Sequence, residues 1–248
     1  MRFTSTLIVG AGGIGSHLAE PLARLMRFHE NGGKALRIVD GDVYEEKNAE
    51  RQMFSLDHVG KPKADVLGTR VWQSVTTRDG AHEFPVNTEC GYVASAEDAA
   101  GLMVRSIKDG GDEGALLVCL CVDNDATRRL FYDAFEFMPK AHRDVVILDC
   151  GNDLETATVV ASFWSERKSK LVSPVEMYEN LRTPNDRVPG GGCLALAPST
   201  PQLMVANMAA AFSALLLVQA LLDGRTLTDV VQSNIRTFTV GVAGGTYG

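Results

Sequence analysis

The sequence predicts an α/β fold, a doubly wound, Rossmann-like, mostly parallel sheet with antiparallel strands added in the C-terminal part. Three observations predict it. A short β-branched run enters the glycine-rich turn TLIVGAGGIG at 6–15, apolar runs and helical segments then alternate to residue 150, and a longer β run follows at 156–164. Alternation is typical of parallel sheets, because parallel strands need a crossover connection between them. We expect one domain, residues 1–248, in which 1–155 form a nucleotide-binding part and 156–248 extend the same fold.

The elements are expected in the following order. β-branched or continuous apolar runs predict strands at 6–9, 35–39, 83–88, 115–122, 145–150 and 156–164, and apolar residues at helical spacing predict helices at 16–30, 63–74, 96–108, 126–137 and 205–222. Pro21 is expected to cause a kink or an irregular opening turn in the first helix, because it lacks the N–H of a helical hydrogen bond. Residues 41–63 read as a loop with one helical piece near 45–54. The end of the chain holds an apolar stretch near 236–242 and an expected mobile tail at 244–248.

Composition narrows the class of protein. The formal net charge of −7 argues against a general nucleic-acid surface, because phosphate backbones are bound by Lys and Arg. The N-terminus lacks a signal-peptide pattern, which predicts a cytoplasmic protein. Polar residues at Asn207, Ser213 and Gln219 interrupt the apolar stretch 205–222, so we expect a buried helix and no membrane partner. The five cysteines form no CxxC pair, so no zinc site is expected.

The glycine-rich turn predicts a phosphate site. Gly10, Gly12 and Gly15 have the spacing in which one glycine allows the tight turn, one lets a phosphate approach the backbone, and one packs helix on strand. Amides at the start of the following helix would face the anion. Asp40 follows Gly15 by 25 residues at the end of the second strand, where dinucleotide folds place an acid for ribose hydroxyls.

Four motifs share one order along the chain. They are GAGGIGS at 10–16, VDGD at 39–42, NAERQ with GKPK between 48 and 63, and VDNDATR at 122–128. In this order the sequence resembles the ThiF/MoeB-like superfamily, the bacterial relatives of ubiquitin-activating enzymes, and is most similar to the ThiF-like proteins of the PRTRC systems. The resemblance covers roughly residues 5–155. It implies a ThiF-like adenylation domain that uses ATP and Mg²⁺ to adenylate the C-terminal carboxylate of a small ubiquitin-like or sulfur-carrier protein, releasing pyrophosphate.

The resemblance also implies roles for particular residues. Asp40 and Asp42 would hold the ribose, and Asp123 would hold Mg²⁺, a usual arrangement of one carboxylate plus substrate phosphates. The remaining nucleotide contacts would come from Gly10, Gly12, Gly13, Gly15, Asn48, Arg51, Gln52, Lys63 and Asn124, and the catalytic group would comprise Arg51, Lys63, Asp123 and Cys193. Asn124 and Arg128 fit the family pattern but are structural as readily as functional. Asp123 could equally cap the following helix.

The chain departs from the family pattern in two respects. Better-known members carry two CxxC pairs that bind zinc, and some complete the site with an arginine from a helix of the partner subunit, whereas only Arg2 precedes the first strand here. This departure argues against completion of the site by a second subunit, although a homodimer is a possible assembly. Cys193, in the segment PGGGC, is the candidate thiol to receive the activated carboxylate or carry sulfur, and the alternative is a cysteine without a role. Cys119 and Cys121 are expected to be packing residues.

Two other functions fit part of the pattern. An NAD-dependent oxidoreductase would account for GAGGIG and Asp40, but it leaves Arg51, Lys63 and Asp123 unexplained. A non-catalytic nucleotide-binding module of the same fold would account for the absence of zinc pairs.

Overall fold

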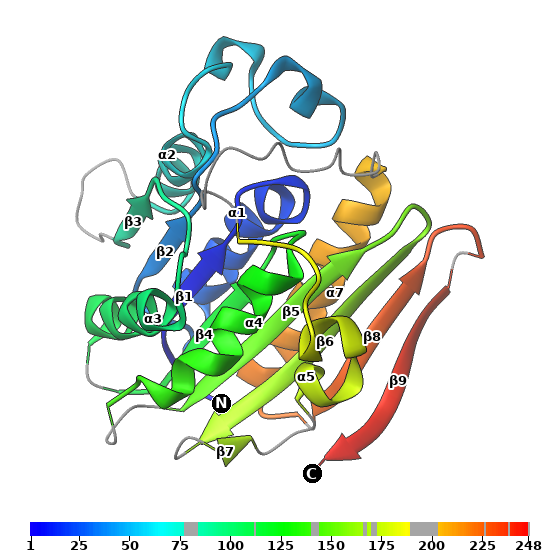
Figure 1. Cartoon of the computed structure of the whole chain (residues 1–248). Helices are drawn as coiled ribbons and strands as arrows, with labels where there is room; N and C mark the ends of the chain where they lie inside the picture. Colours follow the sequence, from blue (N-terminus) through cyan, green and yellow to red (C-terminus); the bar gives the residue numbers. More distant parts are fainter. Residues whose placement is uncertain are drawn as a thin grey trace.

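The computed structural model describes residues 1–76, 84–111, 113–139, 144–165, 168–169, 173–188, 203–225, 227–237 and 239–247. Within these residues, one sheet runs through the molecule in the order β3-β2-β1-β4-β5-β6-β8-β9, with β7 beside β6 (Figure 1). The predicted N-terminal part and its C-terminal extension therefore share a continuous sheet.

Five parallel strands form the first part of the sheet. They are β1 (Phe3–Val9), β2 (Leu36–Val39), β3 (Val86–Glu89), β4 (Ala115–Leu120) and β5 (Val145–Asn152). β1 lies at the centre, with β2 and β3 on one side and β4 and β5 on the other. The strand order thus reverses at β1, and open α/β sheets bind ligands beyond the carboxyl ends of the strands at such a point.

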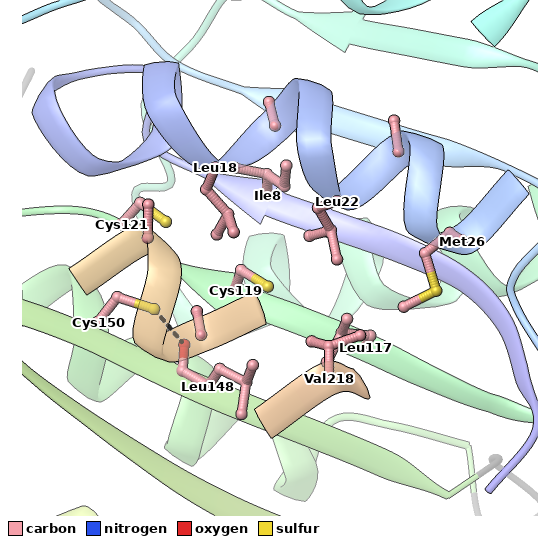
Figure 2. Packing of buried hydrophobic residues seen from close by; sticks show 14 of the residues in the cluster. Ile8, Leu18, Leu22, Met26, Leu117, Cys119, Cys121, Leu148, Cys150 and Val218 are labelled. Carbon is pink, nitrogen blue, oxygen red and sulfur yellow. Dashed lines mark hydrogen bonds between the residues drawn. The ribbon is translucent and has the colours of Figure 1, made fainter. Parts of the chain in front are cut away.

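Helices cover both faces of the sheet. Buried residues of α1 (Gly13–Phe28), α2 (Lys63–Val75) and α7 (Met204–Leu222) share one core cluster, and those of α3 (Ala96–Gly110) and α4 (Asp125–Asp133) share the other. Figure 2 shows Cys119 and Cys121 beside Leu18 of α1, with Cys150 near them. All three cysteines are buried, which confirms that Cys119 and Cys121 are packing residues.

The C-terminal strands are antiparallel, as the sequence predicts. β6 (Thr156–Ser165) pairs with β5, β7 (Lys168–Ser169) and β8 (Leu227–Asn234), and β8 pairs with β9 (Thr239–Tyr247). Two short helices, α5 (Pro174–Met177) and α6 (Glu179–Arg182), lie between β7 and α7 in the sequence. The predicted mobile tail is wrong for residues 244–247, because β9 continues there and Tyr247 pairs with Leu227.

Some boundaries differ from the prediction. α1 begins at Gly13, three residues early, so the glycine-rich turn is also the first turn of the helix. It runs through Pro21 as one helix, with that proline on its exposed side. Short 3₁₀ helices occur at η1 (Glu46–Glu50), η2 (Leu56–His58) and η3 (Ala134–Glu136), the first inside the predicted helical piece. Part of the strand predicted at 83–88 lies outside the described residues.

α7 is the long apolar helix. Its length and mean hydropathy of 2.0 would allow a membrane span, but 56% of its apolar 18-residue stretch is buried within the molecule, where the helix packs against α1, β5, β6 and β8. The prediction of a buried core helix is confirmed. Its outward face still exposes apolar side chains, at Val205, Met208, Phe212 and Leu216.

Candidate functional site

The carboxyl end of β1 carries the glycine-rich turn. Gly10 has φ of +96°, a conformation that favours glycine, and an added Cβ there would lie 2.7 Å from the carbonyl oxygen of Cys121. An added Cβ at Gly15 would lie 1.9 Å from the oxygen of Gly10, and one at Gly13 would lie 2.3 Å from Oδ1 of Asn207. Backbone atoms therefore leave no room for a side chain at Gly10 and Gly15, whereas a side chain at Gly13 would require the Asn207 amide to move.

Gly12 differs from them. The nearest atom to an added Cβ at Gly12 is Nε2 of Gln52, at 3.9 Å, so the space beside it is open. Gly12 is the N-cap of α1, and it supplies no side-chain acceptor for the first amides of the helix. Unpaired amides at a helix start and room for close approach are the two requirements of a phosphate site. Only Gly12 of the four predicted glycines offers that room.

Asp40 is fixed at the end of β2 by backbone amides. Its carboxylate accepts hydrogen bonds from the N–H of Ala11 (2.6 Å) and of Asp42 (2.8 Å). Burial raises the pKa of Asp40, opposed by the nearby ammonium of Lys63 and by these hydrogen bonds. The Asp40 carboxylate therefore connects the second motif to the glycine-rich turn: Oδ2 accepts from Ala11 in the turn, and Oδ1 accepts from Asp42 in the motif.

Asp42 and Lys63 form an ion pair beside it. Nζ of Lys63 lies 2.8 Å from Oδ2 of Asp42, and the lysine side chain is only 8% exposed. Tyr92, which no sequence motif indicated, donates its hydroxyl hydrogen to Oδ1 of the same carboxylate and lies over Gly41. Burial would raise the pKa of Asp42, but the hydrogen bonds from Lys63 and Tyr92 outweigh it and hold the pKa below its ordinary value. Asp42 therefore orients the lysine, rather than leaving both oxygens open for a ribose.

The loop before α2 carries the other predicted phosphate ligands. Asn48 is buried and accepts the N–H of Glu45 on Oδ1 (2.9 Å), which makes it a turn-capping residue. The guanidinium of Arg51 makes no hydrogen bond or ion pair with the described residues. Gln52 is 6% exposed, and its buried Oε1 likewise lacks a partner in the described part of the chain. Arg51 and Gln52 therefore keep unpaired polar groups within the described part of the chain, and Gln52 is the one that lies nearest to the open side of Gly12.

Asp123 and Asn124 follow β4. Asp123 is exposed, and it has no hydrogen-bond partner among the residues that the structure describes. Asn124 caps α4, accepting the N–H of Thr127 on Oδ1 (2.7 Å), and its Nδ2 donates to the carbonyl oxygen of Arg187 (2.6 Å). The structure thus favours the structural role for Asn124 and leaves Asp123 free to meet a cation.

A buried ion pair between Arg128 and Asp149 lies next to the loop that carries Asp123. The guanidinium of Arg128 lies 2.6 Å from a carboxylate oxygen of Asp149 and donates to the carbonyl oxygens of Val122 and Cys150. Arg128 therefore fixes the residue before Asp123, a structural role. In the described ranges, no three His, Cys, Asp or Glu side chains gather to hold a metal. Cys193 lies outside the described residues.

Comparison with known proteins identifies the family of the chain. The ThiF family pattern matches residues 1–147. Over 75 residues, 30% of this chain, the sequence is 37% identical to the NEDD8-activating enzyme E1 catalytic subunit of Arabidopsis thaliana, of which it covers 15%. The resemblance to ThiF/MoeB-like proteins is therefore confirmed.

Solved structures share the fold. A crystal structure of PaaA has a TM-score of 0.62 at 17% identity, and the alignment covers 98% of this chain and 64% of that chain. MccB from E. coli, crystallised with AMPCPP and MccA, has a TM-score of 0.63 at 16% identity with the same coverage, and MccB has also been crystallised with ATP. This chain thus spans just under two thirds of these proteins, and at such identity the likeness concerns the fold alone.

Proposed function

Because the chain belongs to the ThiF family, we propose that it is an ATP-dependent adenylating enzyme of the ubiquitin-activating type, acting on the C-terminal carboxylate of a small ubiquitin-like or sulfur-carrier protein. The observation that carries the proposal is the open face of Gly12, with Gln52 beside it and the neighbouring Arg51 unpaired among the described residues. A triphosphate needs this combination of free amides and fixed cationic groups.

Different residues of the site would bind the phosphates, the ribose and the metal ion. The first amides of α1 would hold phosphate oxygens at Gly12, and Arg51 and Lys63 would neutralise charge as it develops. Asp40 would accept from a ribose hydroxyl on a free lone pair. Asp123 fits Mg²⁺, because it is an exposed carboxylate without a partner in the described part of the chain and Mg²⁺ commonly takes one carboxylate plus phosphates. The metal would supply charge neutralisation at the phosphates.

The proposed reaction is the transfer of an adenylyl group and involves no redox step. A carboxylate oxygen of the partner attacks the α-phosphorus, the bond from that phosphorus to the bridging oxygen breaks, and pyrophosphate leaves with the electron pair. The product is an acyl-adenylate. MccB, crystallised with ATP and with MccA, is similar to this chain in fold, which is compatible with a site for a nucleotide and a second substrate. Homodimer formation and cytoplasmic location stay predictions.

Exchange of labelled pyrophosphate into ATP tests the reaction. The chain is incubated with ATP, Mg²⁺ and small β-grasp proteins whose C-terminal carboxylate is either free or blocked as an amide. We expect exchange only with a free carboxylate. Exchange with the blocked protein would contradict the proposal, and ATP binding without exchange for any partner would favour the non-catalytic module.

Two lysine variants make the assay specific. Lys63→Met removes the buried ammonium and should abolish exchange, whereas Lys61→Met removes an exposed lysine two residues away and should leave exchange unchanged. Circular dichroism of both variants verifies that they are folded. Equal exchange rates in the two variants would remove Lys63 from the site.

A further inference from the structure

Arg70, which lies on α2 and which no motif indicated, joins three segments of the molecule. Its Nη1 donates to the carbonyl oxygen of Met53, in the loop before α2, and its Nη2 donates to the carbonyl oxygen of Ser16, in the first turns of α1. The carboxylate of Glu20 lies 3.7 Å from its Nε. The side chain is 27% exposed, so these bonds are partly shielded from water.

Two further side chains hold the same loop to α1. Oγ of Ser16 accepts the N–H of Met53 (3.1 Å) and donates to the carbonyl oxygen of Gly13 (3.1 Å). Nε2 of His17 lies 3.2 Å from the carbonyl oxygen of Arg51. Together with Arg70, these contacts fix the backbone on both sides of Gln52 against the first turns of α1.

All of these bonds to the loop use its backbone. The side chains of Arg51 and Gln52 are therefore left for another partner, while the backbone that carries them cannot drift from the helix start at Gly12. Holding a binding group in place before the ligand arrives removes an entropy cost from binding, and a displacement of about 1 Å can reduce a rate on the order of a hundredfold.

We propose that Arg70, together with Ser16 and His17, is a positioning residue that presents Arg51 and Gln52 to the phosphate groups of the bound nucleotide. The inference rests on the proposed function and adds to it. Arg70 itself is expected to touch no substrate, because its guanidinium is committed to the carbonyl oxygens of Met53 and Ser16.

The test compares Arg70→Ala with a matched control. Arg24→Ala removes another guanidinium that joins α1 to α2, through the carbonyl oxygen of Ser74 (3.3 Å), at the far end of α2. Dissociation constants for ATP and for adenosine are measured by calorimetry in both variants. We expect Arg70→Ala to weaken ATP binding by about tenfold or more and to leave adenosine binding unchanged. Arg70→Lys should recover only part of the loss, because one ammonium cannot reproduce both arms of the guanidinium. Arg24→Ala should change neither ligand.

A double-mutant cycle separates positioning from general stability. In an Arg51→Ala, Gln52→Ala background, the further change Arg70→Ala should have little effect on ATP affinity, because the groups that it positions are gone. If Arg70→Ala does not fold, Ser16→Ala loosens the same loop through a smaller change. Equal weakening of ATP and adenosine, or full additivity in the cycle, would overturn the inference. Failure of the unaltered chain to bind ATP would instead overturn the proposed function.

Discussion

At the scale of single residues, the glycine-rich turn shows how one motif combines two kinds of requirement. Gly10 and Gly15 are needed because backbone oxygens lie where a Cβ would be, whereas Gly12 meets only the flexible end of Gln52. A substitution at Gly12 should therefore affect the ligand, and one at Gly15 should affect the fold.

We expect Gly15→Ala to lower the melting temperature strongly, because its Cβ would lie 1.9 Å from the carbonyl oxygen of Gly10 and helix and strand would have to separate. Gly12→Ala should change the free energy of unfolding by less than about 1 kcal/mol, since its Cβ meets no atom closer than 3.9 Å. Urea denaturation of both variants is the measurement. A Gly12→Ala protein as unstable as Gly15→Ala would show that the space beside Gly12 is not open.

Spacing in the sequence predicted part of this site. The intervals between Gly10, Gly15 and Asp40 are local features, and they correctly placed the turn and the acid that follows β2. His17, Arg70 and Tyr92 were missed because each acts across 17 to 54 residues of sequence, on carbonyl or carboxylate oxygens that no spacing rule indicates. For Asn124 the sequence left two roles open, and the structure favours helix capping.

At the scale of elements, the start of α4 is capped from a distant segment. The carboxylate of Asp186 accepts the N–H of Asp125 (2.7 Å) and of Ala126 (2.8 Å), and the carbonyl oxygen of Arg187 accepts from Asn124. The partial positive charge of a helix N-terminus favours a carboxylate there. These bonds hold the segment after α6 against the loop that carries Asp123.

Removal of this cap has a predictable cost. Asp186→Ala should lower the free energy of unfolding by about 1 kcal/mol, the usual loss for a helix cap, and Asp186→Asn should lose less because one acceptor oxygen remains. Guanidinium denaturation monitored by circular dichroism measures both. Equal stability of Asp186→Ala and the unaltered chain would mean that water replaces the carboxylate at no cost.

Elements with a strong period were predicted well, and the errors lie at the sheet edge. β4 and β5 are buried apolar runs, and α3 is marked by its capping Ser95, which accepts the N–H of Asp98 (3.1 Å). β8 and β9 were not predicted as strands, and only an apolar stretch near 236–242 was noted, because their residues mix polar and small side chains without a strict alternation. Pairing with β6 makes β8 a strand, and that is a tertiary effect.

At the scale of the whole molecule, two groups with lowered pKa values, His17 and Asp42, should each make the fold less stable in acid. The pKa of His17 is lowered from its ordinary 6.5, chiefly by burial, so the unfolded chain binds a proton there that the folded chain resists. Its contribution to stability is present above pH 6.5 and is lost as the pH falls below that value. The lowered pKa of Asp42 has the same sign, but it acts only around and below the ordinary carboxyl value of 3.8.

The contribution of His17 to this acid sensitivity can be measured separately. Between pH 7 and pH 5, the melting temperature of the unaltered chain should fall, and His17→Gln should flatten this part of the curve, because the glutamine amide can donate to the same carbonyl oxygen without titrating. Scanning calorimetry over this range is the measurement. A slope unchanged in His17→Gln would assign the acid sensitivity to other groups.

The strand order of the whole sheet reverses at β1, and we propose that a nucleoside triphosphate binds there, at the open side of Gly12. Binding at Gly12 is tested by the melting temperature of the unaltered chain and of Gly12→Ala, each with Mg-ATP, with ATP plus chelator, and with NAD(H). At 100 times its dissociation constant, a ligand adds about 2.7 kcal/mol, which is roughly 5 to 10 °C for a chain of this length. We predict that shift with Mg-ATP for the unaltered chain, a smaller one with chelator, and none for Gly12→Ala. Equal shifts in the two proteins, or a shift with NAD(H) alone, would contradict the claim.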